Sequence, residues 1–249
     1  MTNLTVDIGN SRVKMEIRDE SGVLALIKSE NLNFSWIKEM KELYGIDNAV
    51  IASVRGDLEE ILHNVRNEID GDVMDFNRHC VKNFCDRNNY TYPIGADRVA
   101  AFLGAEYLFP GVSKLIVDAG TAMTIDVVDE KGYFCGGNIS LGLQSRMKAL
   151  SKATALLPQV SEIKKTTVFG TNTQDAIVAG ALNGMKGELL FDYLKAKELF
   201  KVQIIILTGG DAEVLEEMVK SFEIKYYKEP DLVGKGLDFY LRSQLQNAG

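Results

Sequence analysis

A segment near the start of the chain recurs about half the chain later. VDIGNSRVKMEIRDESGVL, residues 6–24, aligns with VDAGTAMTIDVVDEKGYF, residues 117–134, with one gap. Each copy predicts a strand ending in an acid and glycine, an alternating second strand and then an acidic turn. A repeat of this length predicts two similar folding units. If the units face each other, two acid-bearing hairpins flank one cleft, which is the arrangement that phosphate chemistry needs.

The turn of the first copy carries groups that suit a phosphate. Gly9 and Asn10 tolerate positive φ, and the turn can bring backbone N–H groups and the side chains of Asn10 and Ser11 close to a phosphate. Asp7, at the strand end, can reach a magnesium ion through water. An ordinary hairpin with a polar tip uses the same residue types, so the motif by itself leaves both interpretations open.

Composition narrows the class of protein. A chain of 249 residues with 46% hydrophobic content suits one large or two small domains with a real core. The net charge of −7 argues against a nucleic-acid partner held by general electrostatics. No apolar run approaches the roughly 18 residues that span a membrane, and the first residues predict a strand rather than a signal peptide. Three cysteines without a secretory leader predict a reducing, cytoplasmic location without disulfides.

Metal and histidine chemistry are disfavoured. The chain has only two histidines, His63 and His79, which argues against a zinc site or a histidine-dependent triad. Cys80 and Cys85 stand near His79, but their spacing matches no zinc pattern.

Periodicity predicts βββαβαβ for the first unit and a similar order for the second. In the first, we expect strands at 4–6, 13–18, 23–30, 48–54 and 72–76, and helices at 34–44 and 58–69. In the second, we expect helices at 97–108, 143–150, 173–198 and 231–246, and strands at 114–120, 123–130, 132–140, 202–211 and 223–227. We place the domain boundary between residues 94 and 95, giving domains 1–94 and 95–249.

Three segments carry further expectations. Residues 78–93 show no clear period and predict a loop over the cleft, and long loops are often functional. Gly180, Gly184 and Gly187 weaken the helix from Thr173 on propensity, so they suggest tight helix packing. The glycines of LTGGD, residues 207–211, indicate either a turn against a nucleotide or a simple βα turn.

GADR, residues 95–98, opens a predicted helix. An acid in the first turn of a helix complements the dipole and caps free N–H groups, which is a sufficient structural explanation of Asp97. Arg98 beside it is less usual at such a position.

Six short motifs follow one another along the chain: DxGNS, GADR, VDAGTAMT, GGNIS, GTNTQDAIVAG and LTGGD. In this order and spacing, from Leu4 to about Leu237, they resemble the type III pantothenate kinases, a family of the acetate and sugar kinase, Hsc70 and actin superfamily. The resemblance implies an α/β fold of duplicated ribonuclease H-like (actin-like ATPase) domains. Each would have a mixed five-stranded sheet flanked by helices, with the ATP cleft between them.

The resemblance also implies the reaction and its requirements. The family phosphorylates pantothenate to 4'-phosphopantothenate with ATP and Mg²⁺, the first step of coenzyme A biosynthesis. Its members are usually homodimers that need a monovalent cation, K⁺ or NH₄⁺. No nucleic-acid or membrane partner is implied.

Residue roles follow from the same resemblance. Asp97 would be the general base toward the substrate hydroxyl, Asp118 would hold the monovalent cation, and Asp7 would lie near Mg²⁺ through water. The residues implied for ATP are Asp7, Ile8, Gly9, Asn10, Ser11, Arg12, Val13, Lys14 and Thr121. The residues implied for pantothenate are Tyr90, Gly95, Ala96, Asp97, Arg98 and Thr173.

The chain departs from the family pattern in three places. Ser11 stands where the family usually has threonine, so the hydroxyl is kept. The family's substrate tyrosine lies three residues before a proline, which indicates Tyr90, but the segment from that proline to GADR is about two residues shorter here, so Tyr92 is an alternative. Leu141 stands where members often have proline, which could loosen that loop.

Two other functions fit the same motifs. One is a kinase for another small acceptor, since the loop over the cleft sets the substrate. The other is a non-catalytic nucleotide-binding regulator of the same fold. The joint presence of Asp7, Asp97, Arg98 and Asp118 argues against the regulator, because a binding module has no need of a general base.

Overall fold

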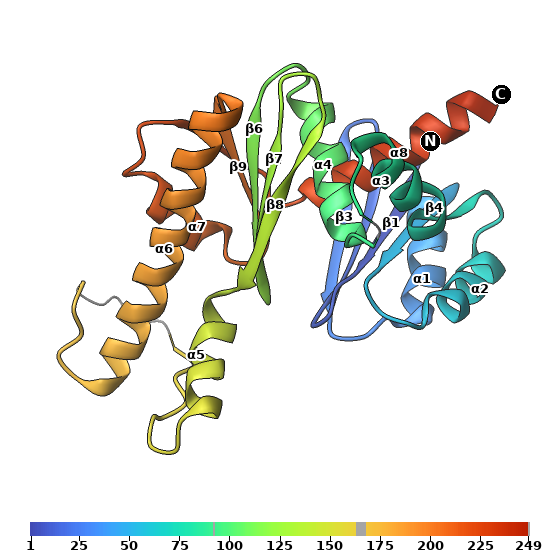
Figure 1. The fold of residues 1–249 in the computed structure, drawn as a ribbon. Coiled ribbons are helices and arrows are strands. Elements are labelled where there is room, and N and C mark those ends of the chain that lie inside the picture. The colour runs from blue at the N-terminus through green and yellow to red at the C-terminus, as the bar shows by residue number, and fades with distance from the viewer. Residues whose placement is uncertain (92, 163–167, 249) are drawn as a thin grey trace. The chain divides into compact units, whose positions relative to one another are not determined.

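The computed structural model describes residues 1–91, 93–162 and 168–248 (Figure 1). The chain packs as two compact units, one formed by Met1–Pro110 with Asp231–Gly249 and the other by Gly111–Pro230. These packing units differ from the domain boundary drawn at residue 94, because helices α4 (Ala96–Leu108) and α8 (Leu232–Ala248) both pack in the first unit.

A close helix crossing holds α4 and α8 together. A β-carbon at Gly104 would overlap the carbonyl oxygen of Leu232, and one at Gly236 would overlap that of Ala100. Only glycine permits two helix backbones to approach this closely. The glycines therefore join α8 to α4, although most of the second unit separates them in sequence.

The first unit is built on a mixed five-stranded sheet in the order β3-β2-β1-β4-β5, which confirms the predicted βββαβαβ. Strands β1, β2 and β3 form an antiparallel meander, while β4 lies parallel to β1 and β5 parallel to β4. The strands are β1 (Asn3–Ile8), β2 (Val13–Asp19), β3 (Gly22–Ser29), β4 (Asn48–Ser53) and β5 (Val73–Asp75).

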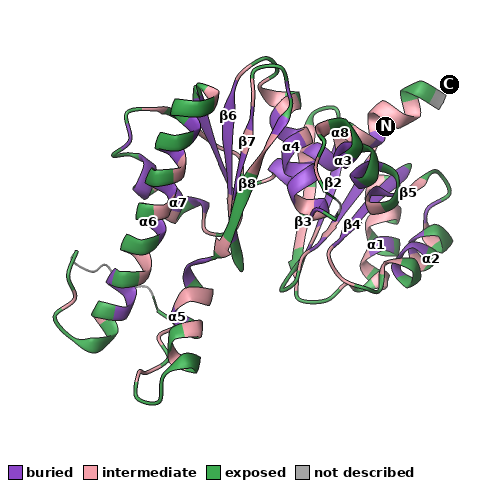
Figure 2. Ribbon diagram, in the orientation of Figure 1, coloured by how far each residue is buried: buried purple, intermediate pink, exposed green. Residues whose placement is uncertain are grey.

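Alternation along β1 divides the two faces of this sheet. Leu4, Val6 and Ile8 belong to a buried cluster with α1 (Phe34–Tyr44) and α2 (Leu58–Glu68). Asn3, on the opposite face, donates to Asp238 of α8 over 2.7 Å. Period-2 patterning thus sends apolar side chains toward α1 and α2, and Asn3 toward α8. Buried residues concentrate on the inner strands β1, β4, β6 (Lys114–Ala119) and β9 (Ile204–Thr208) and on α4, whereas β8 (Phe134–Leu141) is largely exposed (Figure 2).

The predicted loop at 78–93 is wrong over most of its length. The chain forms a π-helical turn, η1 (Asn77–Val81), and then α3 (Lys82–Asn88). Phe84 of α3 is buried and packs edge-on against Phe102 of α4, with ring centroids 5.0 Å apart. This tertiary contact stabilises a helix too short to show a clear period of its own. Tyr92 lies outside the described residues.

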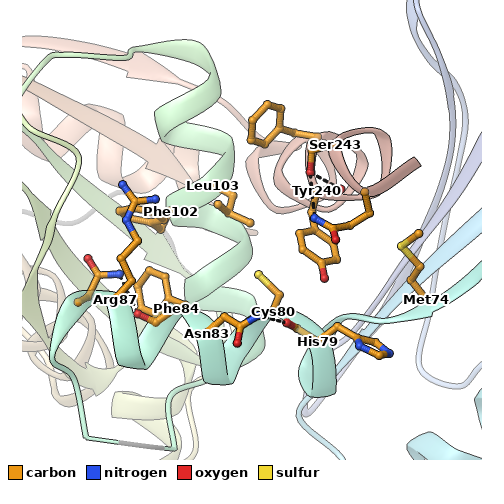
Figure 3. A pocket seen from close by; sticks show the side chains of 13 residues that line it. Met74, His79, Cys80, Asn83, Phe84, Arg87, Phe102, Leu103, Tyr240 and Ser243 are labelled. Carbon is orange, nitrogen blue, oxygen red and sulfur yellow. Dashed lines mark hydrogen bonds between the residues drawn. The ribbon is translucent and has the colours of Figure 1, made fainter. Parts of the chain in front are cut away.

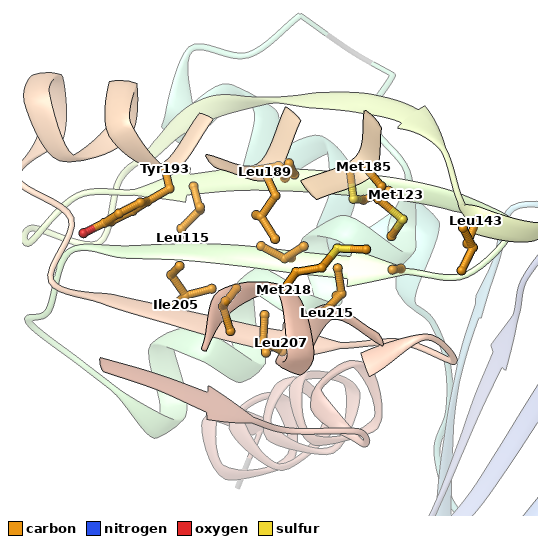
Figure 4. Close-up of a cluster of buried hydrophobic side chains, with 14 of the residues drawn as sticks. Leu115, Met123, Leu143, Met185, Leu189, Tyr193, Ile205, Leu207, Leu215 and Met218 are labelled. Atoms are coloured by element: carbon orange, nitrogen blue, oxygen red, sulfur yellow. The ribbon is translucent and has the colours of Figure 1, made fainter. Parts of the chain in front are cut away.

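The second unit repeats the mixed sheet in the order β10-β9-β6-β7-β8. Helices α5, α6 and α7 contribute to one buried cluster against this sheet, and Met185, Leu189 and Met218 lie within it (Figure 4). The strands are β6 (Lys114–Ala119), β7 (Ala122–Val128), β8 (Phe134–Leu141), β9 (Ile204–Thr208) and β10 (Lys225–Lys228). The helices are α5 (Leu143–Ala153), α6 (Thr173–Phe200) and α7 (Ala212–Val219).

The glycines of α6 do not make the tight packing expected of them. A β-carbon at Gly180 or Gly187 would have no described atom within 4 Å, and at Gly184 it would meet only Arg146 Nη1 at 3.6 Å. Close approaches between two helix backbones occur instead at Gly104 and Gly236. In the described parts of the chain, no helix combines the length and apolar character required to cross a membrane.

Candidate functional site

The turn between β1 and β2 is an exposed, tightly closed loop. The Gly9 amide donates to the Arg12 carbonyl over 2.9 Å, and Asn10, Ser11 and Arg12 are exposed. Ile8, at the end of β1, is only 1% exposed and lies in the core. The turn therefore offers backbone and polar side chains to a ligand, whereas Ile8 can offer only its backbone.

Three other predicted residues of this hairpin are more enclosed. Asp7 is half-buried at the end of β1 and stands opposite Lys14 on β2. Lys14 Nζ lies 2.6 Å from Glu16 Oε1, and Glu16 is 1% exposed. Val13 is buried in the core and, like Ile8, can contribute only backbone. The charge of Lys14 is thus already paired with a buried carboxylate.

Arg55 holds the same turn and was not predicted. Its Nε donates to the Gly9 carbonyl over 2.8 Å, and its Nη2 donates to the Asn10 and Glu30 carbonyls over 3.4 and 3.2 Å. These bonds tie the hairpin turn to β3 and to the end of β4. Sequence reasoning had no signal for this role, because Arg55 lies 46 positions from Gly9.

GADR forms the first turn of α4. Gly95 caps the helix with φ −61° and ψ 134°, and its carbonyl accepts from the Val99 amide over 3.2 Å. Asp97 Oδ1 accepts from the Arg98 amide over 2.8 Å, and a β-carbon at Gly95 would overlap that oxygen. Glycine before the helix therefore leaves room for the Asp97 carboxylate to fold over the helix N-terminus.

The residues around Asp97 differ in their exposure to solvent. Asp97 itself is half-buried, while Arg98 is 6% exposed and Ala96 is fully buried. Tyr90 follows α3, and its amide donates to the Cys85 carbonyl over 3.0 Å. The carboxylate is thus the accessible group of this turn, and Ala96 can contribute only backbone.

The second hairpin has a shorter turn, formed by Gly120 and Thr121. The Gly120 amide donates to the Ala122 carbonyl over 2.9 Å. The Thr121 carbonyl accepts from the Gly142 amide over 3.1 Å and from Ser145 Oγ over 2.6 Å. Thr121 is exposed, so its hydroxyl stands at the tip of a turn whose backbone is fixed from α5.

Asp118 lies against the LTGGD turn. Gly209 has φ +89°, and a β-carbon there would overlap both Asp118 Oδ1 and the Ala119 carbonyl oxygen. The Asp211 amide donates to the Ala119 carbonyl over 2.9 Å. Gly209 is therefore required for a close backbone approach to Asp118, which explains the first glycine of this motif without a nucleotide.

The donor atoms here suit hard cations. The space that a β-carbon at Gly209 would fill borders a carboxylate and a carbonyl oxygen, the ligand types of K⁺ and Mg²⁺. Asp7 offers one half-buried carboxylate at its strand end. In the part of the chain that the structure describes, no three His, Cys, Asp or Glu side chains gather at one point. A cation at either site would therefore need further oxygen atoms from backbone carbonyls, water or nucleotide.

Thr173 is the first residue of α6 and is exposed. The helix is capped by Asn172, whose Oδ1 accepts from the Asp175 amide over 3.0 Å. In the first unit the predicted residues therefore lie in the β1–β2 hairpin and at the start of α4, with Tyr90 after α3. In the second unit they lie at the end of β6, in the Gly120–Thr121 turn and at the start of α6.

A sequence model of the family described as type III pantothenate kinase matches residues 3–190. The chain belongs to this family. A type III pantothenate kinase from Phocaeicola vulgatus is 30% identical over 236 residues, covering 95% of this chain and 96% of that relative. Family membership makes the chain an enzyme of the kinase class.

Solved structures share the fold. A conserved protein from Campylobacter jejuni, assigned to the Baf family of transcriptional activators, has a TM-score of 0.63 at 22% identity and covers 98% of this chain and 99% of its own. The activator of the 2-hydroxyisocaproyl-CoA dehydratase from Clostridium difficile, with bound ADPNP, has a TM-score of 0.58 at 13% identity, covering 100% and 97%. These likenesses, with the two mixed sheets, confirm the predicted duplicated actin-like ATPase fold.

Proposed function

We propose that the chain transfers the γ-phosphoryl group of ATP to the hydroxyl of pantothenate. The product is 4'-phosphopantothenate, and the reaction is the first step of coenzyme A biosynthesis. The family match over residues 3–190 carries this proposal. The geometry of residues 95–98 supports it, because an accessible carboxylate stands beside a buried arginine at a helix N-terminus.

Asp97 is the general base in this proposal. An alcohol is a very weak acid and a carboxylate is a weak base, so Asp97 mainly orients the hydroxyl and takes its proton late. Its Oδ1 is held by the Arg98 amide at 2.8 Å, and one carboxylate oxygen suffices to accept from the substrate. The carboxylate also complements the positive end of the α4 helix dipole.

Pantothenate also carries a carboxylate, for which Arg98 is the matching group. A guanidinium pairs with a carboxylate through two parallel hydrogen bonds, and burial strengthens such a pair. Arg98 is 6% exposed. Tyr90, the backbone of Gly95 and Ala96, and Thr173 supply the remaining contacts of the proposed substrate site.

The phosphates of ATP bind the Gly9–Arg12 turn, with further contact from Thr121. The exposed backbone and the Asn10 and Ser11 side chains suit phosphate oxygens. Mg²⁺ bound with ATP neutralises charge that develops on the phosphoryl group. Asp7 would hold that ion through water, and Asp118 would hold K⁺ or NH₄⁺.

We also propose that the enzyme is a homodimer through the second unit. On α6, Phe191 and Leu194 stand three positions apart on one side of the helix and are 62% and 53% exposed. Large exposed apolar side chains on one unit are typical of an interface. Phe191→Asp should shift the mass measured by light scattering from two chains to one, and an unchanged dimer would contradict this face.

The decisive experiment follows the product itself. The purified protein with ATP, Mg²⁺ and K⁺ should convert pantothenate to 4'-phosphopantothenate, measured by mass spectrometry beside ADP release. Pantothenol has the same hydroxyl but lacks the carboxylate, so it tests Arg98. The kcat/KM for pantothenol should be about 10- to 100-fold lower than that for pantothenate, because one hydrogen-bonded pair between a carboxylate and a guanidinium is lost. ATP binding without phosphorylation of pantothenate would contradict the proposal.

A further inference from the structure

A pocket lies in the first unit, apart from the residues assigned above. Its volume is about 500 Å³, and η1, α3, α4 and α8 form its walls, with Met74 of β5 at one side (Figure 3). We call it the α3–α8 pocket. Phe102 and Leu103 of α4 line it, and they lie five and six residues beyond Asp97, which is about 8–9 Å along a helix axis. It shares no lining residue with the Gly9–Arg12 turn or with GADR.

About half of the residues that line the α3–α8 pocket are aromatic or aliphatic. Phe84 and Phe102 meet edge-on on one side, and Phe239 of α8 lies on another. Tyr240 also lines it, and its ring packs edge-on against Phe76 at 5.2 Å, which fixes its orientation. The size and apolar walls are those of a small-molecule site, which needs only a few polar groups for orientation.

The charged groups at this pocket favour an anion. Arg87 lines it, and among its described lining residues there is no aspartate or glutamate, although the charge of Asp75 acts on Tyr240. This local balance is opposite to the net charge of −7 of the chain. The side-chain amides of Asn83 and Asn88 donate to the His79 and Phe84 carbonyls over 3.0 and 2.9 Å. Among the described lining residues, Arg87 is the one with a permanent positive charge, which suits an anionic group.

The two acidic side chains in the wall do not oppose an anion. Burial raises the pKa of the Cys80 thiol to about 12, and burial, followed by the charges of Cys80 and Asp75, raises the pKa of Tyr240 to about 12. Both therefore stay neutral near pH 7. A neutral thiol is also a poor nucleophile, so this pocket is suited to reversible binding.

We propose that the α3–α8 pocket binds a small organic anion, with one carboxylate, sulfonate or phosphate group on Arg87. The aromatic or aliphatic body of the ligand packs between the Phe84–Phe102 pair and Phe239. Because η1 and α3 lead into Tyr90 and α4 begins with the proposed base, such a ligand would contact the elements that carry the pantothenate site; this link rests on the proposed function.

A pair of fluorescent probes tests the proposal on the full chain. 8-Anilino-1-naphthalenesulfonate has an aromatic body and a sulfonate, and N-phenyl-1-naphthylamine has the same body without the charge. Arg87→Gln should weaken binding of the sulfonate about tenfold, the worth of one charged hydrogen bond, and leave the neutral probe within about twofold. Ser243→Trp, which places an indole in the pocket wall, should weaken both probes. Arg66→Gln on α2 is the matched control and should change neither.

Equal affinity of the sulfonate for the wild type, Arg87→Gln and Ser243→Trp would overturn the proposal, since the probe would then bind elsewhere. Absence of binding to the wild type would overturn it as well. If Ser243→Trp fails to fold, the affinities of Arg87→Gln and Arg66→Gln for the sulfonate probe test the proposal by themselves. The readout is binding without turnover, so its failure is distinguishable from failure of the proposed kinase reaction.

Discussion

Gly236→Ala should destabilise the first unit, because α4 and α8 cross at backbone distance. A β-carbon at position 236 would overlap the Ala100 carbonyl oxygen and lie 2.8 Å from the Gly104 amide nitrogen. Both obstacles are helix backbone, so no side-chain rotation can relieve them. The two helices must separate, which disturbs the contacts on both sides of the crossing.

The magnitude follows from two opposing effects. Overpacking a filled interior costs about 1–3 kcal/mol, and a collision with backbone belongs at the upper end of that range. Replacing glycine by alanine inside a helix offsets about 1 kcal/mol of this cost. The net loss of unfolding free energy is therefore about 2 kcal/mol, which lowers Tm by about 4–8 °C in a chain of this size.

Thermal unfolding followed by circular dichroism measures this loss, with Gly180→Ala as the matched control. Gly180 also lies inside a helix, but a β-carbon there would have no described atom within 4 Å. The unfolding free energy of the control should rise by about 0.5–1 kcal/mol. The same substitution therefore stabilises the chain at position 180 and destabilises it at position 236. An unchanged or raised Tm for Gly236→Ala would refute the close crossing of α4 and α8.

Three further outcomes are expected. Asp97→Asn should keep ATP and pantothenate binding but lower kcat by about 10²–10⁴-fold, while the exposed Asp86→Asn keeps full turnover; equal activity of the two would remove Asp97 from the mechanism. Asp118→Asn should flatten the dependence of turnover on K⁺, measured with Na⁺ as replacement, and an unaltered response would exclude the proposed cation role. Burial raises the pKa of Asp231, but the hydrogen bonds and charges of Lys235 and Arg18 together outweigh it and lower that pKa below 3.8. The ionised Asp231 therefore stabilises the folded state above about pH 4, and this stabilisation is lost as the pH falls below that value. Asp231→Asn should lower Tm at pH 7 by a few degrees, about 1 kcal/mol, and the difference from wild type should narrow toward pH 3.

Local patterns predicted the two hairpins well. Strands β1 and β2, and again β6 and β7, pair with their chain neighbours, so alternation and turn residues were sufficient to place them. The helix in residues 82–88 was missed for the opposite reason. Its buried Phe84 is stabilised by Phe102 on another element, and seven residues are too few to show a period.

Candidate site residues were predictable where they end an element. Asp7 and Asp118 end their strands and Asp97 opens α4, and these positions follow from the repeat and the short motifs. Arg55 was not predictable, because its bond to the Gly9 carbonyl depends on β4 lying beside β1.

The sequence by itself determined the family, the order of the strands, and the helices other than η1, α3 and α7, since these depend on period, turn chemistry and motif within short windows. Only the tertiary structure decided that α8 packs on α4 in the first unit, and that Gly104 and Gly236, rather than the glycines of α6, are the close contacts. It also decided that η1, α3, α4 and α8 enclose a pocket. The physical reason is that these contacts join residues far apart in the chain. Backbone approach and side-chain volume at such contacts produce no periodic pattern in the local sequence.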